Sequence, residues 1–113
     1  MARSPPVRSY SRYSLQALRL LGDLLRAARI EKGLGVQALA ERAGISRDLL
    51  YRIEKGDPRC GIGVVFELAA ILDVPLFEPG LDALRQRGRE VQARLVLLPR
   101  AVHAGRGEVK DDF

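Results

Sequence analysis

Apolar residues recur at intervals of three and four along residues 14–30, the period that places side chains on one face of an α-helix. Ser14 is a residue type that caps helix starts, and Gly33 is one that ends helices. Arg29, in the last turn, suits the negative end of the helix dipole. Gly22 marks either a break or a point of close packing. The pattern predicts one amphipathic helix with inward positions Leu15, Leu18, Leu21, Leu25 and Ala28.

Three shorter helices are predicted in the next part of the chain. Val36–Ala43 stops at a glycine, a second helix is capped by Ser46 and runs to Lys55, and Ile62–Leu72 ends before a Val-Pro pair. Residues 1–13 contain two prolines with interleaved Arg and Tyr, and they show no periodicity. They are therefore predicted to form a basic flexible arm. The arm either reaches a minor groove or phosphates, or is a solvated tail.

The segment Ile62–Leu72 is apolar on nearly every side, because Val64 and Ala70 occupy positions that normally face solvent. A helix of this kind has to be covered by another surface. Residues 81–98 can supply that surface, since their apolar residues have the three–four spacing of a coiled-coil seam, with Gly88 in the one step that lacks an apolar residue. Residues 94–98 alone fit a short strand equally well. The predicted contact residues are Val64, Ile71, Leu81, Leu84, Val91, Leu95 and Leu98.

The 113 residues carry a net charge of +5, which is unevenly distributed. Residues 1–14 contain three arginines and no acid, whereas residues 22–75 contain eight acidic and eight basic residues. A basic balance suits a polyanionic partner, but it also suits solubility alone. Because the predicted globular part is neutral, nucleic-acid binding has to come from a locally basic face.

Composition argues against several other classes of protein. Aromatic residues make up 5% of the chain and Trp is absent, so the core is expected to be aliphatic. Cys60 and His103 are each the single residue of their type, which excludes an internal disulfide framework and a zinc site. No nucleophile–base pair or phosphate-cradling glycine loop is visible, so neither an enzyme nor a cofactor is expected. No apolar run approaches the ~20 residues that span a bilayer, and no secretory signal is visible, which favours the cytoplasm and no membrane partner.

The spacing of small and apolar residues in residues 37–56 carries the functional signal. Ala40 is small where two helices would cross closely, and Gly44 stands where the chain would turn with a positive φ. The second helix is then anchored by Ile45, Leu50 and Ile53. Its outward positions are Ser46, Arg47, Asp48, Tyr51, Arg52 and Lys55.

With its flanking segments, this stretch resembles the phage repressor/Cro (XRE) family of helix-turn-helix regulators. The similarity covers residues 21–76 without a gap and is most specific in LAERAGISRDLLYRIEKG. It implies an all-α, five-helix lambda-repressor-like helix-turn-helix domain, assigned to residues 14–76, with a C-terminal helix or short strand for dimerisation at residues 77–98. Flexible tails are expected at residues 1–13 and 99–113.

The resemblance also implies a transcriptional repressor whose Ser46–Lys55 helix enters the major groove of operator DNA. Arg47 would pair with a guanine, and Arg52 would reach a neighbouring base or phosphate. Asp48 would either accept a hydrogen bond from cytosine or only stabilise the helix dipole. The expected phosphate contacts are Gln37, Ser46, Tyr51, Lys55 and Arg59.

One position departs from the family pattern. The family commonly opens its second helix with Ser or Thr followed by a Gln that binds phosphate, whereas this chain has Gly35 and Val36 there and Gln37 one place later. The change weakens one backbone clamp, by ~1 kcal/mol on the usual scale for helix caps. It leaves the expected fold intact.

Proteins of this kind commonly act as dimers that read half-sites about 34–36 Å apart. We therefore expect a homodimer formed through residues 62–98, with packing inside one chain as the alternative. The C-terminal layout, which ends in VKDDF, is similar to HipB-like antitoxins, which pair with a HipA-like kinase toxin. That narrower similarity implies an autoregulated toxin–antitoxin operon, with Val109 and Phe113 docking the toxin. The remaining alternatives are a stand-alone regulator and an interaction module that binds no DNA.

Overall fold

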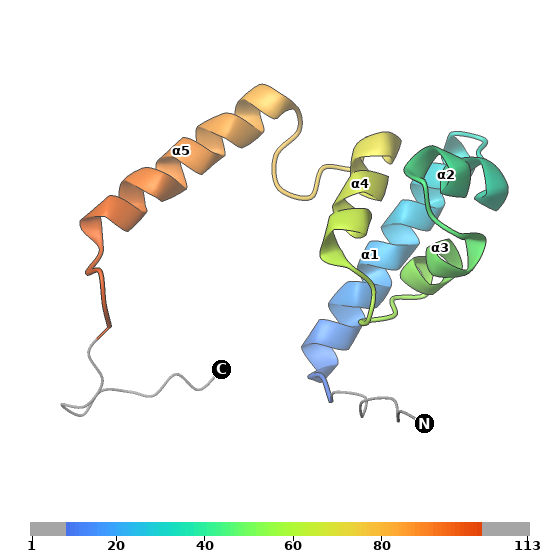
Figure 1. Cartoon of the computed structure of the whole chain (residues 1–113), viewed down its shortest axis with the longest axis horizontal. Coiled ribbons are helices and arrows are strands. Elements are labelled where there is room, and N and C mark those ends of the chain that lie inside the picture. Colours follow the sequence, from blue (N-terminus) through green and yellow to red (C-terminus); the bar gives the residue numbers. More distant parts are fainter. Residues whose placement is uncertain (1–8, 103–113) are drawn as a thin grey trace. The chain divides into compact units, whose positions relative to one another are not determined.

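The computed structural model describes residues 9–102, which form five α-helices and, within that range, no strand. The helices are α1 (Arg12–Glu31), α2 (Val36–Ala43), α3 (Arg47–Glu54), α4 (Ile62–Leu72) and α5 (Leu81–Leu97) (Figure 1). The chain divides into two compact units, Met1–Leu76 with α1–α4 and Phe77–Phe113 with α5. The all-α helix-turn-helix fold class predicted from the sequence is confirmed.

Helix α1 begins earlier than the sequence pattern predicts. Its N-cap is Ser11, whose Oγ accepts a hydrogen bond from the backbone N–H of Ser14 at 3.1 Å. Ser14, the predicted cap, is therefore a helical residue, and Arg12 and Tyr13 belong to α1 rather than to an arm. Two serines three residues apart satisfy the same capping preference, so the sequence does not distinguish between them.

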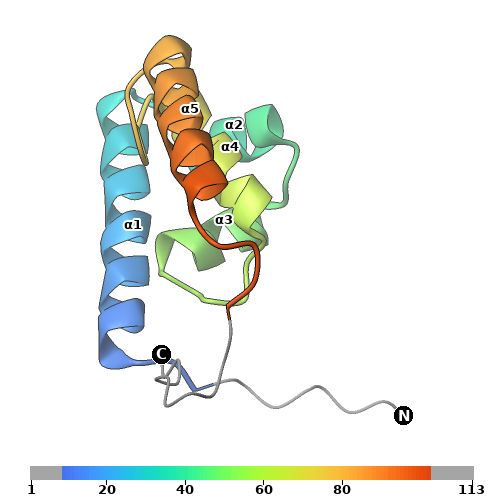
Figure 2. The same ribbon diagram turned by 90° about the vertical axis from the view of Figure 1, so that its left-hand side faces the viewer.

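The core of the first unit is built from leucines of all four helices. Leu25, Leu39, Leu50, Leu68 and Leu72 are each at most 1% exposed. Burying such a side chain contributes about 1.5–3 kcal/mol. Helices α1 and α2 each contact both α3 and α4, so the four helices enclose one apolar cluster. Figure 2 shows α2, α3 and α4 grouped beside the long α1.

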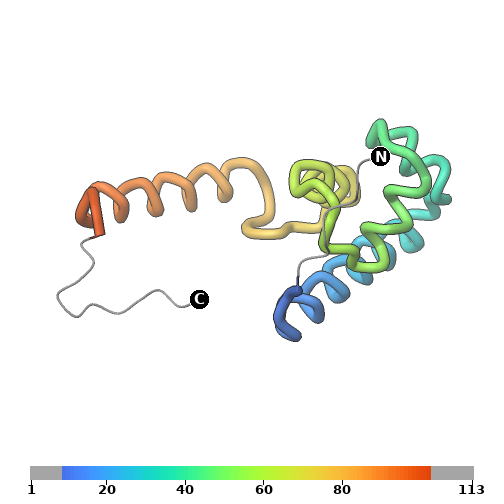
Figure 3. Tube along the Cα trace, turned by 60° about the horizontal axis from the view of Figure 1, so that its bottom comes forward, coloured from blue at the N-terminus to red at the C-terminus, as the bar shows by residue number. Residues whose placement is uncertain are grey.

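A tight turn joins α2 to α3, and the tube in Figure 3 follows the chain through it. Gly44 ends α2 with φ 70°, a left-handed conformation that favours glycine. The backbone N–H of Ile45 donates to the carbonyl of Ala40 at 3.0 Å, and Ala40 itself is 2% exposed. The predicted roles of the small residue and the turn glycine are confirmed.

The outer surface of α4 is formed largely by residues other than the predicted contact residues. Val64 and Ile71 are partly buried and pack against the core of their own chain. The apolar residues that α4 exposes are Ile62, at 73%, Phe66, at 39%, and Ala70. These three are four residues apart and therefore follow one side of the helix. Helix α4 thus has an exposed apolar side, as its composition predicts, and Ile62 and Phe66 contribute most of it.

The second unit contains α5 alone. Leu81–Leu97 is a continuous helix with Leu98 as its C-cap, so the alternative of a short strand at residues 94–98 is wrong. An ion pair between Arg87 and Glu90, at 3.6 Å, lies on its surface, and no residue of α5 is buried. Across residues 9–102, no helix is long and apolar enough to cross a membrane.

Candidate nucleic-acid interface

Helix α3 exposes one polar side over its whole length. Its N-cap is Ser46, whose Oγ accepts a hydrogen bond from the backbone N–H of Leu49 at 3.0 Å, as the sequence predicts. Such a cap is worth about 0.5–2 kcal/mol and fixes the first turn, where a recognition helix approaches base edges. The exposed side chains of this helix and its caps are Ser46, Arg47, Asp48, Tyr51 and Lys55.

The opposite side of α3 is held inside the fold. Leu50 and Ile53 lie in the apolar core, with 0% and 4% of their surfaces exposed, and Ile45 packs against the same core just before the helix. Because these residues fix the rotation of α3 about its axis, they also fix which side chains point outward. The predicted anchoring residues are confirmed.

A buried ion pair, which the sequence pattern does not predict, joins α1 to α3. The Nε and Nη2 of Arg29 donate to the two carboxylate oxygens of Glu54 at 2.7 and 3.1 Å, and its Nη1 donates to the carbonyl of Leu34 at 3.0 Å. The hydrogen bond to Glu54 raises the pKa of the Arg29 guanidinium. The signal in the sequence is Glu54 itself, an acid beside Ile53 on the inward side, where a charge requires a partner. The helix-dipole role predicted for Arg29 omits this partner.

Close approach of the two backbones reinforces this connection. Gly22 is buried in α1, and a Cβ added there would lie 2.5 Å from the carbonyl oxygen of Glu54. No real side chain fits at that distance. Gly22 is therefore a point of close packing, and the alternative of a helix break is wrong because α1 runs through it without interruption.

Asp57 accepts hydrogen bonds from two arginines that the sequence predicts to contact DNA. Its carboxylate accepts hydrogen bonds from the Nε of Arg52 at 3.1 Å and from the Nε of Arg59 at 3.2 Å, and also from the backbone N–H of Arg59 at 2.9 Å. These bonds, the backbone one first, hold the pKa of Asp57 well below its usual range. Arg52 is half-buried and Arg59 exposed, and both are oriented by their own chain.

The start of α2 differs from the family pattern in the way the sequence indicates. Val36 is partly buried against the core, and its side chain has no polar group to offer to a phosphate. Gln37 is exposed, but its amide Nε2 donates to the carboxylate of Glu41 at 2.8 Å. One N–H of this amide is thus used within the helix, and the second N–H is the donor left for the predicted phosphate contact.

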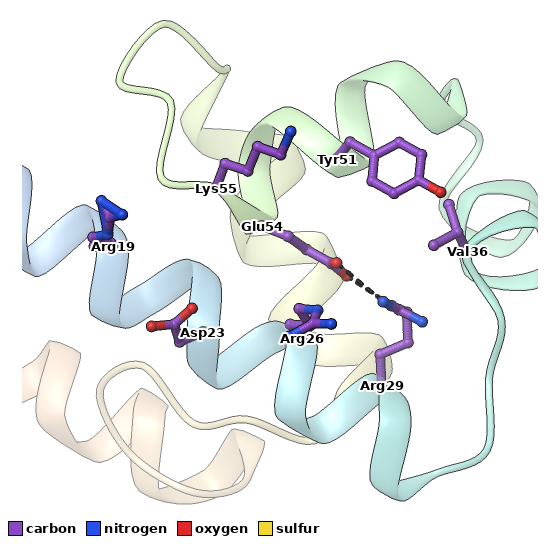
Figure 4. Close-up of a pocket in the computed structure, with 8 residues that line it drawn as sticks. All are labelled: Arg19, Asp23, Arg26, Arg29, Val36, Tyr51, Glu54 and Lys55. Carbon is purple, nitrogen blue, oxygen red and sulfur yellow. Dashed lines mark hydrogen bonds and ion pairs between the residues drawn. The ribbon is translucent and has the colours of Figure 1, made fainter.

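A pocket of about 720 Å³ adjoins the outer side of α3. Residues of α1 form one wall, residues at the end of α3 form the other, and α2 contributes a single residue (Figure 4). The lining residues are Arg19, Asp23, Arg26, Arg29, Val36, Tyr51, Glu54 and Lys55. Of these, the sequence predicts only Tyr51 and Lys55 as nucleic-acid contacts.

The remaining predicted contact residues belong to α5 or to the C-terminal tail. Leu81, Leu84, Leu95 and Leu98 are exposed on or at the end of α5, and Val91 is half-buried. The two residues expected to dock a toxin, Val109 and Phe113, lie outside the described residues.

Helix α2, the turn at Gly44 and helix α3, whose inner side is anchored to α1 and whose outer side is polar, form a helix-turn-helix module. The comparisons with known proteins agree: residues 20–84 match the family described as a helix-turn-helix domain, and the chain belongs to this family. The predicted resemblance is thereby confirmed at the level of the family, whereas the narrower likeness to HipB-like antitoxins stays a prediction.

Similar proteins include three that are named as candidate HTH-type transcriptional regulatory proteins. That of Pyrococcus horikoshii is 39% identical over 74 residues, which are 66% of this chain and 23% of the relative. The protein of Thermococcus kodakarensis is 37% identical over 82 residues, which are 73% of this chain and 24% of the relative. The protein of Methanocaldococcus jannaschii is 33% identical over 79 residues, which are 70% of this chain and 24% of the relative. The chain thus spans about a quarter of the length of these relatives.

Proposed function

We propose that the protein is a sequence-specific DNA-binding transcriptional repressor of the cytoplasm, with α3 in the major groove of its operator. The observation that carries this proposal is the way α3 is mounted. One side is fixed by a buried core and a buried ion pair, while the other presents exposed polar side chains. A rigid helix with an outward polar side is what reading base edges requires.

Arg47 is the residue best placed to read a base. It is the first residue of α3, it is exposed, and among residues 9–102 it makes no ion pair or hydrogen bond through its side chain. Its guanidinium can donate two hydrogen bonds to O6 and N7 of a guanine, a contact worth about 1–3 kcal/mol of discrimination. Asp48, one position further, can accept a hydrogen bond from N4 of a cytosine.

In this proposal Arg52 contacts a neighbouring base or a phosphate, and Arg59 contacts a phosphate. Both are held by Asp57, so their guanidinium groups are positioned before DNA arrives. Positioning lowers the entropy cost of ordering a long side chain on binding. Ser46, Tyr51 and Lys55 supply phosphate contacts, which fix the register of α3 without reading sequence.

The test is selection of a preferred sequence from random duplexes, followed by titration of Arg47→Ala against it. We expect the variant to bind more weakly by about 1–3 kcal/mol and to lose its preference at one base pair. Arg89→Ala, which removes the same charge from an exposed position of α5, serves as the control. A wild-type protein that selects no sequence and shows no salt-dependent affinity for duplex DNA would favour the protein-interaction module instead.

We further propose that the protein acts as a homodimer, with the apolar seam of α5 as the main contact. Leu81, Leu84, Leu95 and Leu98 are exposed and, together with Val91 and with Gly88 in the remaining step, follow the three–four spacing of paired helices. Ile62, which is 73% exposed on α4, is a second apolar contact in this proposal. Packing of these surfaces within one chain is the alternative, and it predicts a monomer at all concentrations.

An antitoxin role in an autoregulated operon is the narrower proposal, and it depends on the C-terminal tail. Deleting residues 109–113, which include Val109 and Phe113, should weaken any complex with a HipA-like kinase toxin and leave DNA affinity unchanged. Co-purification of the intact and shortened chains with a kinase from a neighbouring gene measures this. Equal recovery of the kinase with both chains would remove the tail from the proposal.

A further inference from the structure

Three arginines form a row along α1. Arg12, Arg19 and Arg26 are seven residues apart, which is close to two helical turns, so they lie on one side of the helix about 10 Å apart along its axis. All three are exposed, and within residues 9–102 none of them takes part in an ion pair or side-chain hydrogen bond. The positive charges of the row are therefore not needed for ion pairs or hydrogen bonds within residues 9–102.

Two members of the row lie beside the end of α3. Arg19 and Arg26 line the pocket of Figure 4 together with Tyr51 and Lys55 of the α3 region. Arg19 and Lys55 also line a smaller pocket of about 370 Å³ next to it. The approach is close, because a Cβ added to Gly56 would lie 3.0 Å from the Cα of Arg19.

The pocket carries a surplus of positive charge. Four of its lining residues are cationic and two are anionic, a difference of two charges. Glu54 is already neutralised by Arg29 through their buried ion pair. Among the lining residues, Asp23 is then the one carboxylate left to Arg19, Arg26 and Lys55, so this part of the pocket is able to take an anion.

We propose that Arg19 and Arg26, together with Lys55, bind phosphates of the DNA backbone beside the groove that α3 occupies, and that Arg12 extends this contact along the strand. This contact rests on the proposed function. Duplex DNA is the partner because Tyr51 and Lys55 belong both to the pocket and to the outward side of α3, so the two surfaces are continuous. Guanidinium groups also match phosphate through paired N–H donors.

Binding by this row is independent of sequence, which sets it apart from the role of Arg47. The test compares Arg19→Gln, Arg26→Gln and the double variant with the wild type, on the selected operator and on a scrambled duplex. We expect each single change to weaken binding to both duplexes by the same factor. We also expect the slope of log affinity against log salt concentration to become shallower by about 0.9 for each phosphate that is no longer neutralised. Arg19→Lys, which keeps the charge, should retain the wild-type slope.

Two controls make the result specific. Arg89→Gln removes an exposed charge from α5 and should leave the slope unchanged. Thermal unfolding of each variant checks the fold, which substitutions at exposed positions should preserve. Wild-type affinity and slope in the double variant would overturn the role of the arginine row, while an altered sequence preference in Arg47→Ala would still uphold the proposed function. Absence of any DNA binding by the wild type would overturn both.

Discussion

At the scale of single residues, the interaction that most constrains the position of α3 is an ion pair. The Arg29–Glu54 pair is nearly inaccessible, with side chains 10% and 4% exposed, and the two side chains share two hydrogen bonds. A buried pair of this kind adds little by itself, but removing one partner leaves an uncompensated charge in the interior. The pair therefore acts as a constraint on how α1 and α3 meet.

Replacing Glu54 by Gln should lower the free energy of unfolding by about 3–5 kcal/mol, because Arg29 would then be buried without a counter-charge. Urea-induced unfolding followed by circular dichroism measures the change. Lys32→Ala is the matched control, since Lys32 forms an exposed pair with Asp73 at 3.2 Å. Pairs of that kind contribute about 0–1 kcal/mol. Equal destabilisation of the two variants would contradict the importance assigned to burial.

Asp57 gives a prediction that depends on pH. Its pKa is lowered in the folded state by hydrogen bonds from Arg59 and Arg52, so its charged form stabilises the fold above an unfolded-state pKa of about 3.9. This contribution disappears as the pH falls through the lower, folded-state pKa. The stability difference between the wild type and Asp57→Asn should be greatest at about pH 5–7 and shrink in more acidic solution.

Urea midpoints measured over this pH series test the expectation. Glu67→Gln, which alters an exposed carboxylate outside any ion pair of residues 9–102, is the control. A difference for Asp57→Asn that grows on acidification would show that the carboxylate is not stabilised in its charged form.

At the scale of elements, the sequence is most predictive where local signals are strong. Helices α2, α3 and α4 are bounded by glycines, a serine cap or a Val-Pro pair, and their bounds match the predictions to within one residue. The start of α1 and the conformation of residues 94–98 are harder to predict, because two serines fit the same cap and a short apolar run fits helix and strand alike.

The candidate site is only partly predictable for a related reason. Outward positions of α3 follow from its period, so Arg47, Asp48 and Lys55 can be identified from sequence alone. Partners that are distant in sequence cannot, because nothing local links Arg29 to Glu54 across 25 positions. The same holds for the arginines of α1, which reach the pocket only because α1 packs against α3 in space.

The close packing of α1 and α3 yields a prediction at this scale. Gly22→Ala should destabilise the protein by about 1–3 kcal/mol or more, because the added Cβ would meet backbone atoms of Ile53 and Glu54 at 2.5–2.8 Å. Gly63→Ala is the control: it lies within α4 with no other atom within 4 Å of the added Cβ, and it should stabilise the helix by about 0.5–1 kcal/mol. Thermal unfolding of both variants measures the contrast. A neutral Gly22→Ala would mean that the two helices can separate without cost.

At the scale of the whole molecule, the low net charge of the helix-turn-helix region limits how strongly one copy is attracted to DNA. Residues 22–75 have equal numbers of acidic and basic residues. The net charge of this region therefore adds little long-range attraction to DNA, and linking two copies is an effective way to gain affinity, since the second binding event becomes intramolecular.

A dimer should therefore bind a duplex with two half-sites at least about tenfold more tightly than one with a single half-site. The gain should disappear in Leu95→Asp, because a charge in the α5 seam opposes pairing. Val96→Asp is the control, since Val96 is 80% exposed and lies on another side of the same helix. Analytical ultracentrifugation should show the wild type and Val96→Asp as dimers and Leu95→Asp as a monomer. If the wild type and both variants are monomers, packing of the apolar surfaces within one chain is favoured instead.

The way α3 is mounted has a consequence for how specificity can change over generations or in the laboratory. Its stability depends on Leu50, Ile53 and Glu54, whereas Arg47 and Asp48 make no side-chain hydrogen bond within residues 9–102. The positions proposed for recognition are thus separate from those that the fold requires, although both lie in the same short segment. Under the proposed function, exchanging the outward positions gives new operator preferences, while the inward positions maintain the fold.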